Sequence, residues 1–308
     1  MILPAAIVLI LLGAAYAYWE VFYAPRRRQQ SAADIPKGSQ YARERDSMVP
    51  LIREMEGVAF EPVTITAEDG TSLFGRYYHV RDGAPLQIQF HGYRSFAVRD
   101  FCGGNKLARE MGQNTLLVDQ RSHGKSGGTD ITFGNRELQD CLCWARYARQ
   151  RFGRETPIFL SGASMGAATV LMASDLDLPE TVIGIIADSP YSSPGAITRK
   201  VCRDRHLPVA NVWPLVRLGA RLYGGFSISG GGAVEAVKHT KVPILLIHGE
   251  DDRFVPCAMS REIFDACVSP KFLATFPDAG HVLSYIVDPT RYEQVIGEFV
   301  RFCEQRVR

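Results

Sequence analysis

Short apolar runs of strand length alternate with segments of helical periodicity from about residue 60 to the end of the chain. The first two runs, Val63–Ala67 and Ser72–Val80, alternate apolar and polar positions around Glu68–Gly70, which predicts a β-hairpin. The later runs are more uniformly apolar, as expected of strands buried in a parallel sheet. They are Pro85–Phe90, Asn114–Asp119, Pro157–Ser161, Val182–Asp188, Val242–His248 and Lys271–Phe276. Helices are predicted between them at about 100–112, 135–152, 164–175, 259–268 and 289–305.

This alternation predicts an α/β fold with a mostly parallel, eight-stranded sheet that carries helices on both faces. We assign this domain to residues 58–308. Residues 190–240 interrupt the alternation, because they separate two strands by about 50 positions, far more than a crossover needs. They contain several prolines and the run Gly230–Gly232. We interpret them as an inserted small helical cap.

The first 19 residues carry no side chain that is charged at neutral pH. A helix of that length rises about 28 Å, roughly the hydrocarbon thickness of a bilayer. Aromatic residues and then Arg26–Arg28 follow, so the pattern predicts a transmembrane anchor over residues 1–23, with the rest of the chain in the cytoplasm. Ala15–Ala17 leaves a cleaved signal peptide as an alternative, and a buried apolar helix is a second. Residues 24–57 are predicted to form a juxtamembrane tether with a short helix.

Composition and charge exclude several classes of protein. A hydrophobic fraction of 46% and a charged fraction of 22% are typical of a globular chain. The 35 basic and 33 acidic residues give a net charge of +2, too balanced for a dedicated nucleic-acid binder. The 7 cysteines lack C-x-x-C spacing, and Gly124–Ser126 lacks the preceding glycine of a P-loop. We therefore expect no metal and no cofactor.

The segment Gly162-Ala163-Ser164-Met165-Gly166 follows a predicted strand and opens a predicted helix. This is the context of a G-x-S-x-G nucleophile elbow, in which the two glycines permit a sharp turn and the serine hydroxyl projects above the sheet. A serine hydroxyl is a weak nucleophile at neutral pH, so Ser164 needs an adjacent base that is oriented by a carboxylate.

Candidates for the base and the acid follow the last two predicted strands. His281 comes after the final strand, and the acidic run Glu250-Asp251-Asp252 comes after the strand before it. The order serine, acid, histidine is the chain order of one known arrangement of this catalytic triad. We predict Ser164, Asp252 and His281 as catalytic residues.

Together these motifs resemble the α/β-hydrolase superfamily of serine esterases and serine peptidases. The resemblance covers about 250 residues and includes His91-Gly92-Tyr93 and Asp119 to Ser126. The segment His248 to Pro256 resembles the family's stretch whose fifth residue is the triad acid, which favours Asp252 over its acidic neighbours. The resemblance also implies that the backbone N–H groups of Tyr93 and Met165 form the oxyanion hole.

The predicted function is that of a membrane-anchored serine hydrolase that cleaves a carboxylic ester or thioester with a small-molecule or lipid-like acyl group. Two alternatives remain open. One is an aminopeptidase-like serine peptidase, for which residues 190–240 offer only Asp204 and Glu235 to bind a substrate amine. The other is a catalytically idle membrane scaffold, because a fold does not by itself determine a function.

Overall fold

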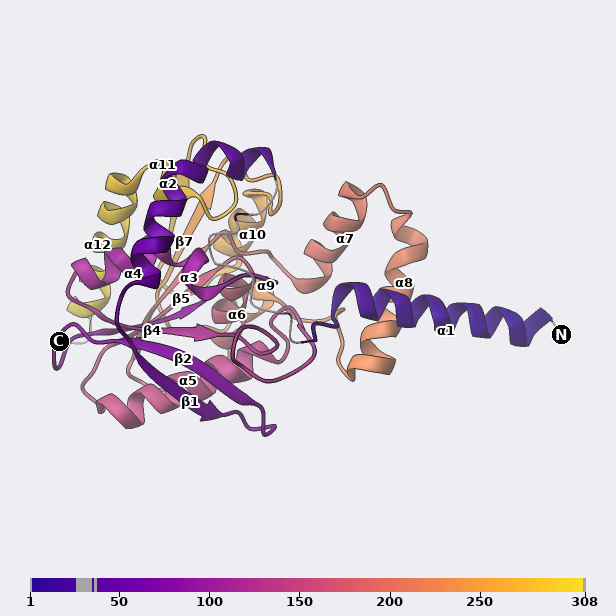
Figure 1. Ribbon diagram of the computed structural model, residues 1–308, viewed down its shortest axis with the longest axis horizontal. Coiled ribbons are helices and arrows are strands. Elements are labelled where there is room, and N and C mark those ends of the chain that lie inside the picture. The colour runs from indigo at the N-terminus through magenta and orange to yellow at the C-terminus, as the bar shows by residue number, and fades with distance from the viewer. Residues whose placement is uncertain (1, 26–34, 36–37, 307–308) are drawn as a thin grey trace.

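An eight-stranded sheet forms the centre of the structure, a computed structural model that describes residues 2–25, 35 and 38–306. The strands are β1 (Glu61–Thr66), β2 (Ser72–Tyr78), β3 (Leu86–Phe90), β4 (Asn114–Asp119), β5 (Ile158–Ala163), β6 (Val182–Asp188), β7 (Ile244–Gly249) and β8 (Lys271–Phe276). Their order is β1-β2-β4-β3-β5-β6-β7-β8 (Figure 1). The strand β2 pairs antiparallel with β1 and β4, and the other pairs are parallel. The predicted α/β fold with a mostly parallel, eight-stranded sheet is confirmed.

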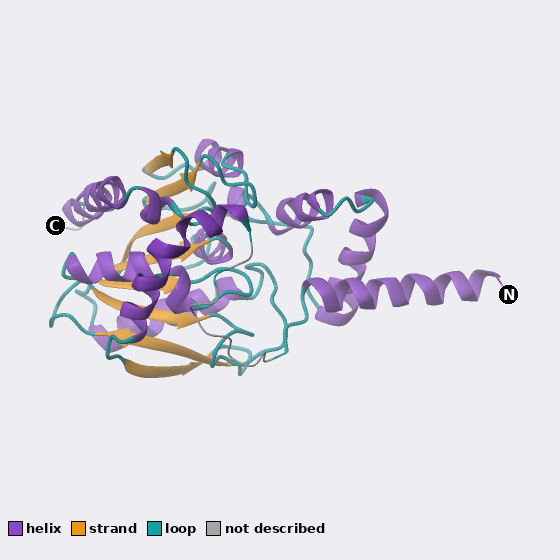
Figure 2. Ribbon diagram, turned by 45° about the horizontal axis from the view of Figure 1, so that its top comes forward, coloured by secondary structure: helices purple, strands orange, loops and turns teal. Residues whose placement is uncertain are grey.

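Helices cover both faces of this sheet, as Figure 2 shows. Every residue of β3 to β7 is buried, which explains why apolar residues predominate in their sequences. On one face, apolar side chains pack against α5 (Glu137–Phe152), α6 (Met165–Ala173) and α10 (Ala258–Ala266). On the other face, they pack against α4 (Cys102–Glu110) and α12 (Pro289–Gln305).

The carboxyl ends of the parallel strands meet at one edge of the sheet, where α/β proteins place their ligand sites. The loop after β3 begins at His91, Ser164 follows β5, and Asp188 ends β6. Asp252 follows β7, and His281 follows β8. Residues that lie far apart in the sequence therefore converge on this edge.

The N-terminal helix α1 (Ile2–Val21) packs on residues 190–240, which we call the insertion, and extends away from the sheet (Figure 1). The insertion forms α7 (Pro194–Asp204), α8 (Val209–Gly219), a π-helical turn η1 (Ala220–Gly224) and α9 (Ala233–Ala236). The helices α1 and α8 approach closely, because a Cβ on Gly219 would lie 2.4 Å from the carbonyl oxygen of Ala14.

Within the described part of the chain, no helix has the length and apolar character needed to cross a bilayer. The transmembrane anchor expected over residues 1–23 is therefore not supported. The residues Arg26–Arg28, on which the expected orientation depended, lie outside the described residues.

The tether expected over residues 24–57 contains a helix, α2 (Ser39–Glu56), that is longer than predicted and packs on the body of the protein. Its buried side chains Met48, Ile52 and Met55 recur every three to four residues and contact the α4 side of the sheet. The segment from Ser39 onward therefore belongs to the folded domain.

We expect Ile52→Ala to lower the free energy of unfolding by about 2–5 kcal/mol, because Ile52 is 0% exposed and its removal leaves a cavity. Urea unfolding of the full chain measures this change. The matched control is Arg43→Ala at an exposed position of α2, which is expected to change stability by less than about 0.5 kcal/mol. Equal effects of the two substitutions would show that α2 does not pack as described.

Candidate active site

Ser164 occupies the turn between β5 and α6 with φ 55° and ψ −113°. Few non-glycine residues adopt a positive φ, and such strain concentrates at functional sites. A Cβ on Gly162 would lie 2.3 Å from backbone atoms of Gly166, and one on Gly166 would lie 1.9 Å from the carbonyl oxygen of Phe90. Only glycine fits these two positions, so the glycines of the motif make the tight turn possible.

The structure brings Ser164, His281 and Asp252 together in one chain of hydrogen bonds. The Ser164 hydroxyl donates to His281 Nε2 over 2.8 Å, and His281 Nδ1 donates to Asp252 Oδ2 over 2.6 Å. Asp252 Oδ1 accepts hydrogen bonds from the backbone N–H groups of Phe254 (2.9 Å) and Val255 (2.8 Å). This geometry is that of a nucleophile, a base and an orienting acid.

Burial distinguishes Asp252 from its acidic neighbours. Asp252 is 6% exposed, whereas Asp251 and Glu250 are exposed. Glu250 accepts a hydrogen bond from the hydroxyl of Thr275 instead. Only Asp252 of the three contacts His281, in agreement with the choice made from the sequence.

The electrostatics of the pair favour a charged imidazole and a charged carboxylate. Burial would raise the pKa of Asp252, but the charge of His281 and hydrogen bonds from His248 and His281 hold it well below its usual value of 3.8. Burial would lower the pKa of His281, but the charge and hydrogen bond of Asp252 leave it above the usual 6.5. Asp252 therefore stabilises the protonated form of His281.

Asp188 is a second buried carboxyl group at this site, and the sequence analysis does not identify it. Its oxygens accept hydrogen bonds from the hydroxyls of Ser189 (2.9 Å) and Tyr292 (3.3 Å). Burial raises its pKa to about 6, and its negative charge favours protonation of His281. The available signal is its position, because Asp188 ends a predicted strand at the same sheet edge as the other site residues.

The loop after β3 carries Tyr93, one of the two expected oxyanion donors, and Met165 begins α6 beside Ser164. Backbone N–H groups in the first turn of a helix have no partner within the helix. The loop lies close to the elbow, because a Cβ on Gly92 would be 3.3 Å from the Cβ of Ser164. Asp100 Oδ2 accepts a 2.8 Å hydrogen bond from the backbone N–H of Gly92 and so holds this loop in place.

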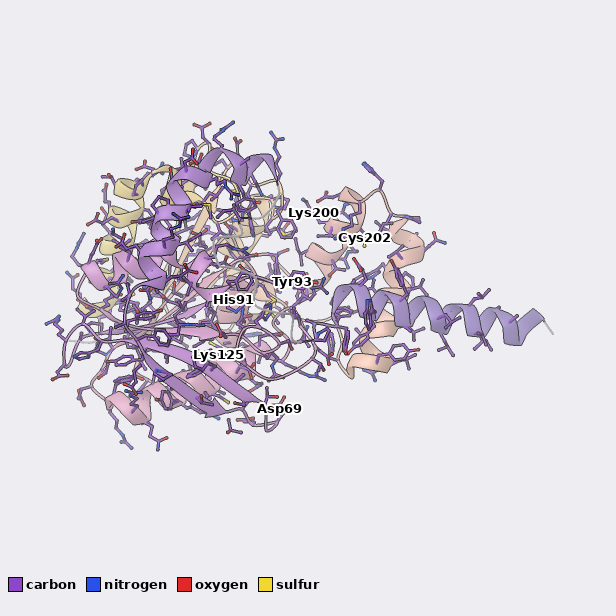
Figure 3. All side chains as sticks on the ribbon, viewed as in Figure 1. Asp69, His91, Tyr93, Lys125, Lys200 and Cys202 are labelled. Carbon is purple, nitrogen blue, oxygen red and sulfur yellow. The ribbon has the colours of Figure 1, made fainter. Side chains whose placement is uncertain are left out.

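The side chain of Tyr93 points away from the site. Its hydroxyl donates to the carbonyl oxygen of Val21 over 2.8 Å, which links the loop to the end of α1. In Figure 3, Tyr93 lies on the side of the body that faces α1, and His91 lies further from α1. His91 Nε2 accepts from the backbone N–H of Gln120 over 3.1 Å, which links the loop after β3 to the loop after β4.

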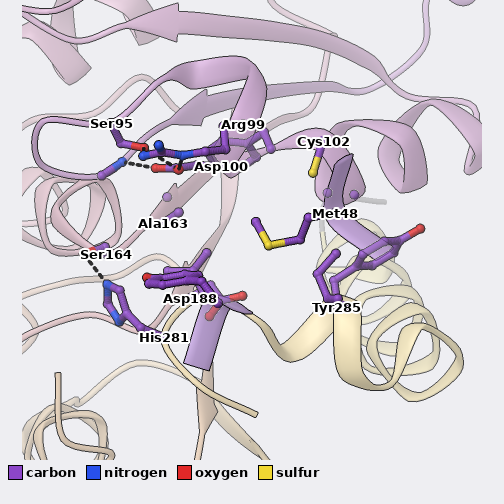
Figure 4. Close-up of a pocket in the computed structure, with 18 of the residues that line it drawn as sticks. Met48, Ser95, Arg99, Asp100, Cys102, Ala163, Ser164, Asp188, His281 and Tyr285 are labelled. Atoms are coloured by element: carbon purple, nitrogen blue, oxygen red, sulfur yellow. Dashed lines mark hydrogen bonds and ion pairs between the residues drawn. The ribbon is translucent and has the colours of Figure 1, made fainter. Parts of the chain in front are cut away.

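A cavity of about 830 Å³ opens beside Ser164 and His281 (Figure 4). Residues from α2, α3 (Ala97–Asp100), α4 and α11 (Ser284–Val287) line it together with the loops that carry the triad. Among the described residues that line the cavity, none comes from the insertion at 190–240. The helix α2 covers the position at which a cap was expected.

Neither the cavity nor the remainder of the described chain holds a group of three or more His, Cys, Asp or Glu side chains arranged to bind a metal ion.

Comparison with known proteins gives the family. The sequence model of the alpha/beta hydrolase family matches residues 90–295, which is more than half of the chain. The chain belongs to the α/β-hydrolase family. Its matched region runs from the end of β3 to α12 and includes Ser164, Asp252 and His281.

Several relatives of this α/β-hydrolase cover much of its length. Protein YqkD of Bacillus subtilis is 23% identical over 292 residues, which are 94% of this chain and 92% of YqkD. Protein YfhR of Escherichia coli K12 is 26% identical over 234 residues, which are 72% of this chain and 73% of YfhR. The lysophosphatidylserine lipase ABHD12 of Danio rerio is 23% identical over 213 residues, which are 64% of this chain and 52% of that protein.

Solved structures resemble this α/β-hydrolase as well. The esterase Pf2001 of Pyrococcus furiosus superposes with a TM-score of 0.65 at 25% identity, covering 82% of this chain and 93% of Pf2001. Est1E of Butyrivibrio proteoclasticus has a TM-score of 0.59 at 20% identity, covering 80% of this chain and 99% of Est1E, which shows the fold alone. Esterase and lipase relatives support the classification of this α/β-hydrolase as a hydrolase.

We expect Asp188→Asn to lower the pH at which His281 titrates, because the substitution removes a negative charge that favours the imidazolium form. In the unaltered protein this titration lies above pH 6.5, where Asp188, with its pKa of about 6, is mostly ionised. NMR titration of the histidine ring protons, with His281→Gln to assign the signal, measures the midpoint.

The control for this titration is Asp82→Asn, which removes a carboxylate that is fully exposed on the surface. It is expected to leave the midpoint of His281 unchanged. The same midpoint in the Asp188→Asn and unaltered proteins would contradict the assigned electrostatic contact.

Proposed function

We propose that this protein is a serine hydrolase that cleaves a carboxylic ester or thioester by acyl transfer. The observation that carries the proposal is the continuous hydrogen-bond chain from Ser164 through His281 to Asp252. Support comes from the strained backbone of Ser164 and from the cavity that opens beside it. The esterase and lipase names of several relatives favour ester bonds.

In the first half of the reaction, the Ser164 oxygen bonds to the carbonyl carbon of the substrate and its proton moves to His281 Nε2. The electron pair of the carbonyl moves to its oxygen, which the backbone N–H groups of Tyr93 and Met165 stabilise. The bond from the carbonyl carbon to the leaving group then breaks, and the leaving alcohol or thiol takes the proton from His281. The acyl group stays bonded to Ser164.

In the second half, a water molecule gives a proton to His281 and its oxygen bonds to the acyl carbon. Collapse of this second tetrahedral intermediate breaks the bond to Ser164, which regains its proton from His281. Asp252 stays ionised throughout, because its pKa lies well below neutral pH. It orients the imidazole and stabilises its charge in both halves.

The alternative of an aminopeptidase gains no support from the cavity. A substrate amine would need a carboxylate that is available to bind it, and among the described residues the carboxylates that line the cavity are Asp100 and Asp188. Asp100 already accepts hydrogen bonds from Gly92 and Ser95, and Asp188 accepts them from Ser189 and Tyr292.

The proposal includes attachment of the protein to a bilayer through α1. The six consecutive apolar residues Ile7–Leu12 are each at least 40% exposed, an unusual density of apolar surface for a helix in water. Trp19 and Tyr16 are also exposed, and such rings favour the interface between lipid and water. A lipid surface would cover this apolar helix.

We expect the double substitution Leu9→Asp and Leu12→Asp to reduce the fraction of full-length protein that floats with phosphatidylcholine and phosphatidylglycerol vesicles by about tenfold or more, because charged groups are costly in lipid. The control is Val268→Asp, which adds a charge at a 67% exposed position on the body of the protein. Equal flotation of all three proteins would rule out α1 as the attachment.

We expect a fluorophosphonate probe to modify Ser164 in the full-length protein, since such probes react with serines activated by a base. Mass spectrometry of the modified peptide locates the label. Ser164→Ala should abolish labelling and lower the turnover of p-nitrophenyl butyrate by about 10⁴-fold or more, while the protein stays folded. A folded protein that is not labelled and hydrolyses no ester would favour the idle scaffold instead.

A further inference from the structure

The cavity continues well beyond the catalytic residues. In Figure 4, the side chain of Met48 projects into the middle of the cavity, with Ser164 and His281 on one side and Cys102 and Tyr285 on the other. We call the part beyond Met48 the distal compartment. A total volume of about 830 Å³ lies near the upper end of the range for small-molecule sites, so the cavity is much larger than a short acyl group requires.

The helix α2 sets the position of Met48 relative to the triad. At its first turn, Gln40 Oε1 accepts a 3.4 Å hydrogen bond from the backbone N–H of His281. Met48 follows eight residues later on the same helix, which corresponds to a rise of about 12 Å. Gln40, Tyr41, Arg45 and Met48 all line the cavity, so α2 forms one wall from the triad to the distal compartment.

Apolar side chains make up a large part of the cavity wall. Leu107 of α4, Ile286 of α11 and Ile296 of α12 line the cavity together with the rings of Tyr285 and Tyr292. The Cys102 thiol lies beyond Met48, and burial raises its pKa to about 12, so this group is uncharged near neutral pH. The charged side chains of Arg99, Asp100 and Asp188 lie on the Ser164 side of Met48 (Figure 4), so the part beyond Met48 favours a hydrocarbon chain over a charged headgroup.

Two glycines in the first turn of α4 make room at this end. A Cβ on Gly103 would lie 2.1 Å from the ring of Tyr285, and Gly104 also lines the cavity. Glycine within a helix costs about 1 kcal/mol relative to alanine. At Gly103 the missing side chain lets Tyr285 pack on the helix, and at Gly104 it leaves space in the cavity. The Tyr285 ring lies directly on the backbone of α4 and closes the side of the compartment.

We propose that the distal compartment binds the acyl chain of the ester substrate and that Met48 determines the chain length it accepts. This inference rests on the proposed serine hydrolase function. The acyl group is the part of the substrate that remains bonded to Ser164 after the alcohol has left. A compartment that continues from Ser164 suits that part, because the alcohol must diffuse out before water can enter.

The test is the hydrolysis of p-nitrophenyl esters from acetate to palmitate by the full-length protein, at concentrations below those at which the esters form micelles. Each methylene that becomes buried should raise kcat/KM about threefold to fourfold until the chain fills the compartment. Met48→Ala removes the side chain that projects into the middle of the cavity, so the preferred acyl chain becomes longer. Met48→Trp places a larger side chain there, so long-chain esters lose at least about tenfold in kcat/KM relative to butyrate.

The matched control is Met55→Ala. Met55 lies on the same face of α2, two turns further along, and is 2% exposed, but it does not line the cavity. It loses the same atoms from the same helix and is expected to keep the chain-length preference of the unaltered protein. Thermal unfolding of each variant shows whether it is folded, and Met48→Leu gives a variant of similar volume that should retain the preference.

A second series of substrates, acetate esters of alcohols of increasing length, varies the leaving group alone. We expect kcat/KM in this series to respond little to substitution of Met48. A response in this series and not in the acyl series would overturn the assignment of the compartment to the acyl chain. An unchanged acyl preference in Met48→Ala and Met48→Trp would overturn the role of Met48, provided that Ser164 is labelled in both.

Fluorophosphonate labelling distinguishes failure of the proposed serine hydrolase function from failure of the proposed acyl compartment. Absence of fluorophosphonate labelling at Ser164 in the unaltered protein contradicts the serine hydrolase itself. Labelling with no change in chain-length preference contradicts only the acyl compartment.

Discussion

The close contact between the backbone of Gly166 and the carbonyl oxygens of Phe90 and His91 is the constraint on which the site depends. The absence of a side chain at position 166 lets the first turn of α6 lie directly against the end of β3. The elbow that carries Ser164 and the loop that carries Tyr93 therefore lie side by side. Any side chain at position 166 would separate the nucleophile from one of its two expected oxyanion donors.

The central part of the fold and the three positions proposed for the triad are predictable from sequence because their signals are local. The strands are short apolar runs, and a glycine on each side of Ser164 reports a turn that few other residues could make. The choice of Asp252 over Asp251 depended on the family resemblance, and the structure supports that choice through the burial of Asp252 and its hydrogen bond with His281. The positions of strand ends were enough to place His281 near Ser164.

The wall of the cavity was not predictable in the same way, because it depends on contacts between segments that are distant in sequence. Helix α2 carries many charged residues, which concealed the apolar stripe of Met48, Ile52 and Met55. Because of its length, the insertion at 190–240 was interpreted as a cap. It packs on α1 instead. Asp100 acts through the backbone of Gly92, and no sequence pattern reports a contact of that kind.

The link between α1 and the loop that follows β3 has a consequence for preparing the protein. The hydroxyl of Tyr93 donates to the carbonyl oxygen of Val21, and the guanidinium of Arg94 donates to the carbonyl oxygens of Glu20 and Tyr23. Phe22 is completely buried between Phe133 and Phe226. Truncation after residue 23, the usual route to a more soluble sample, would remove these acceptors and this ring together. The shortened chain would therefore be a variant of the catalytic site, and its activity would not stand for that of the whole protein.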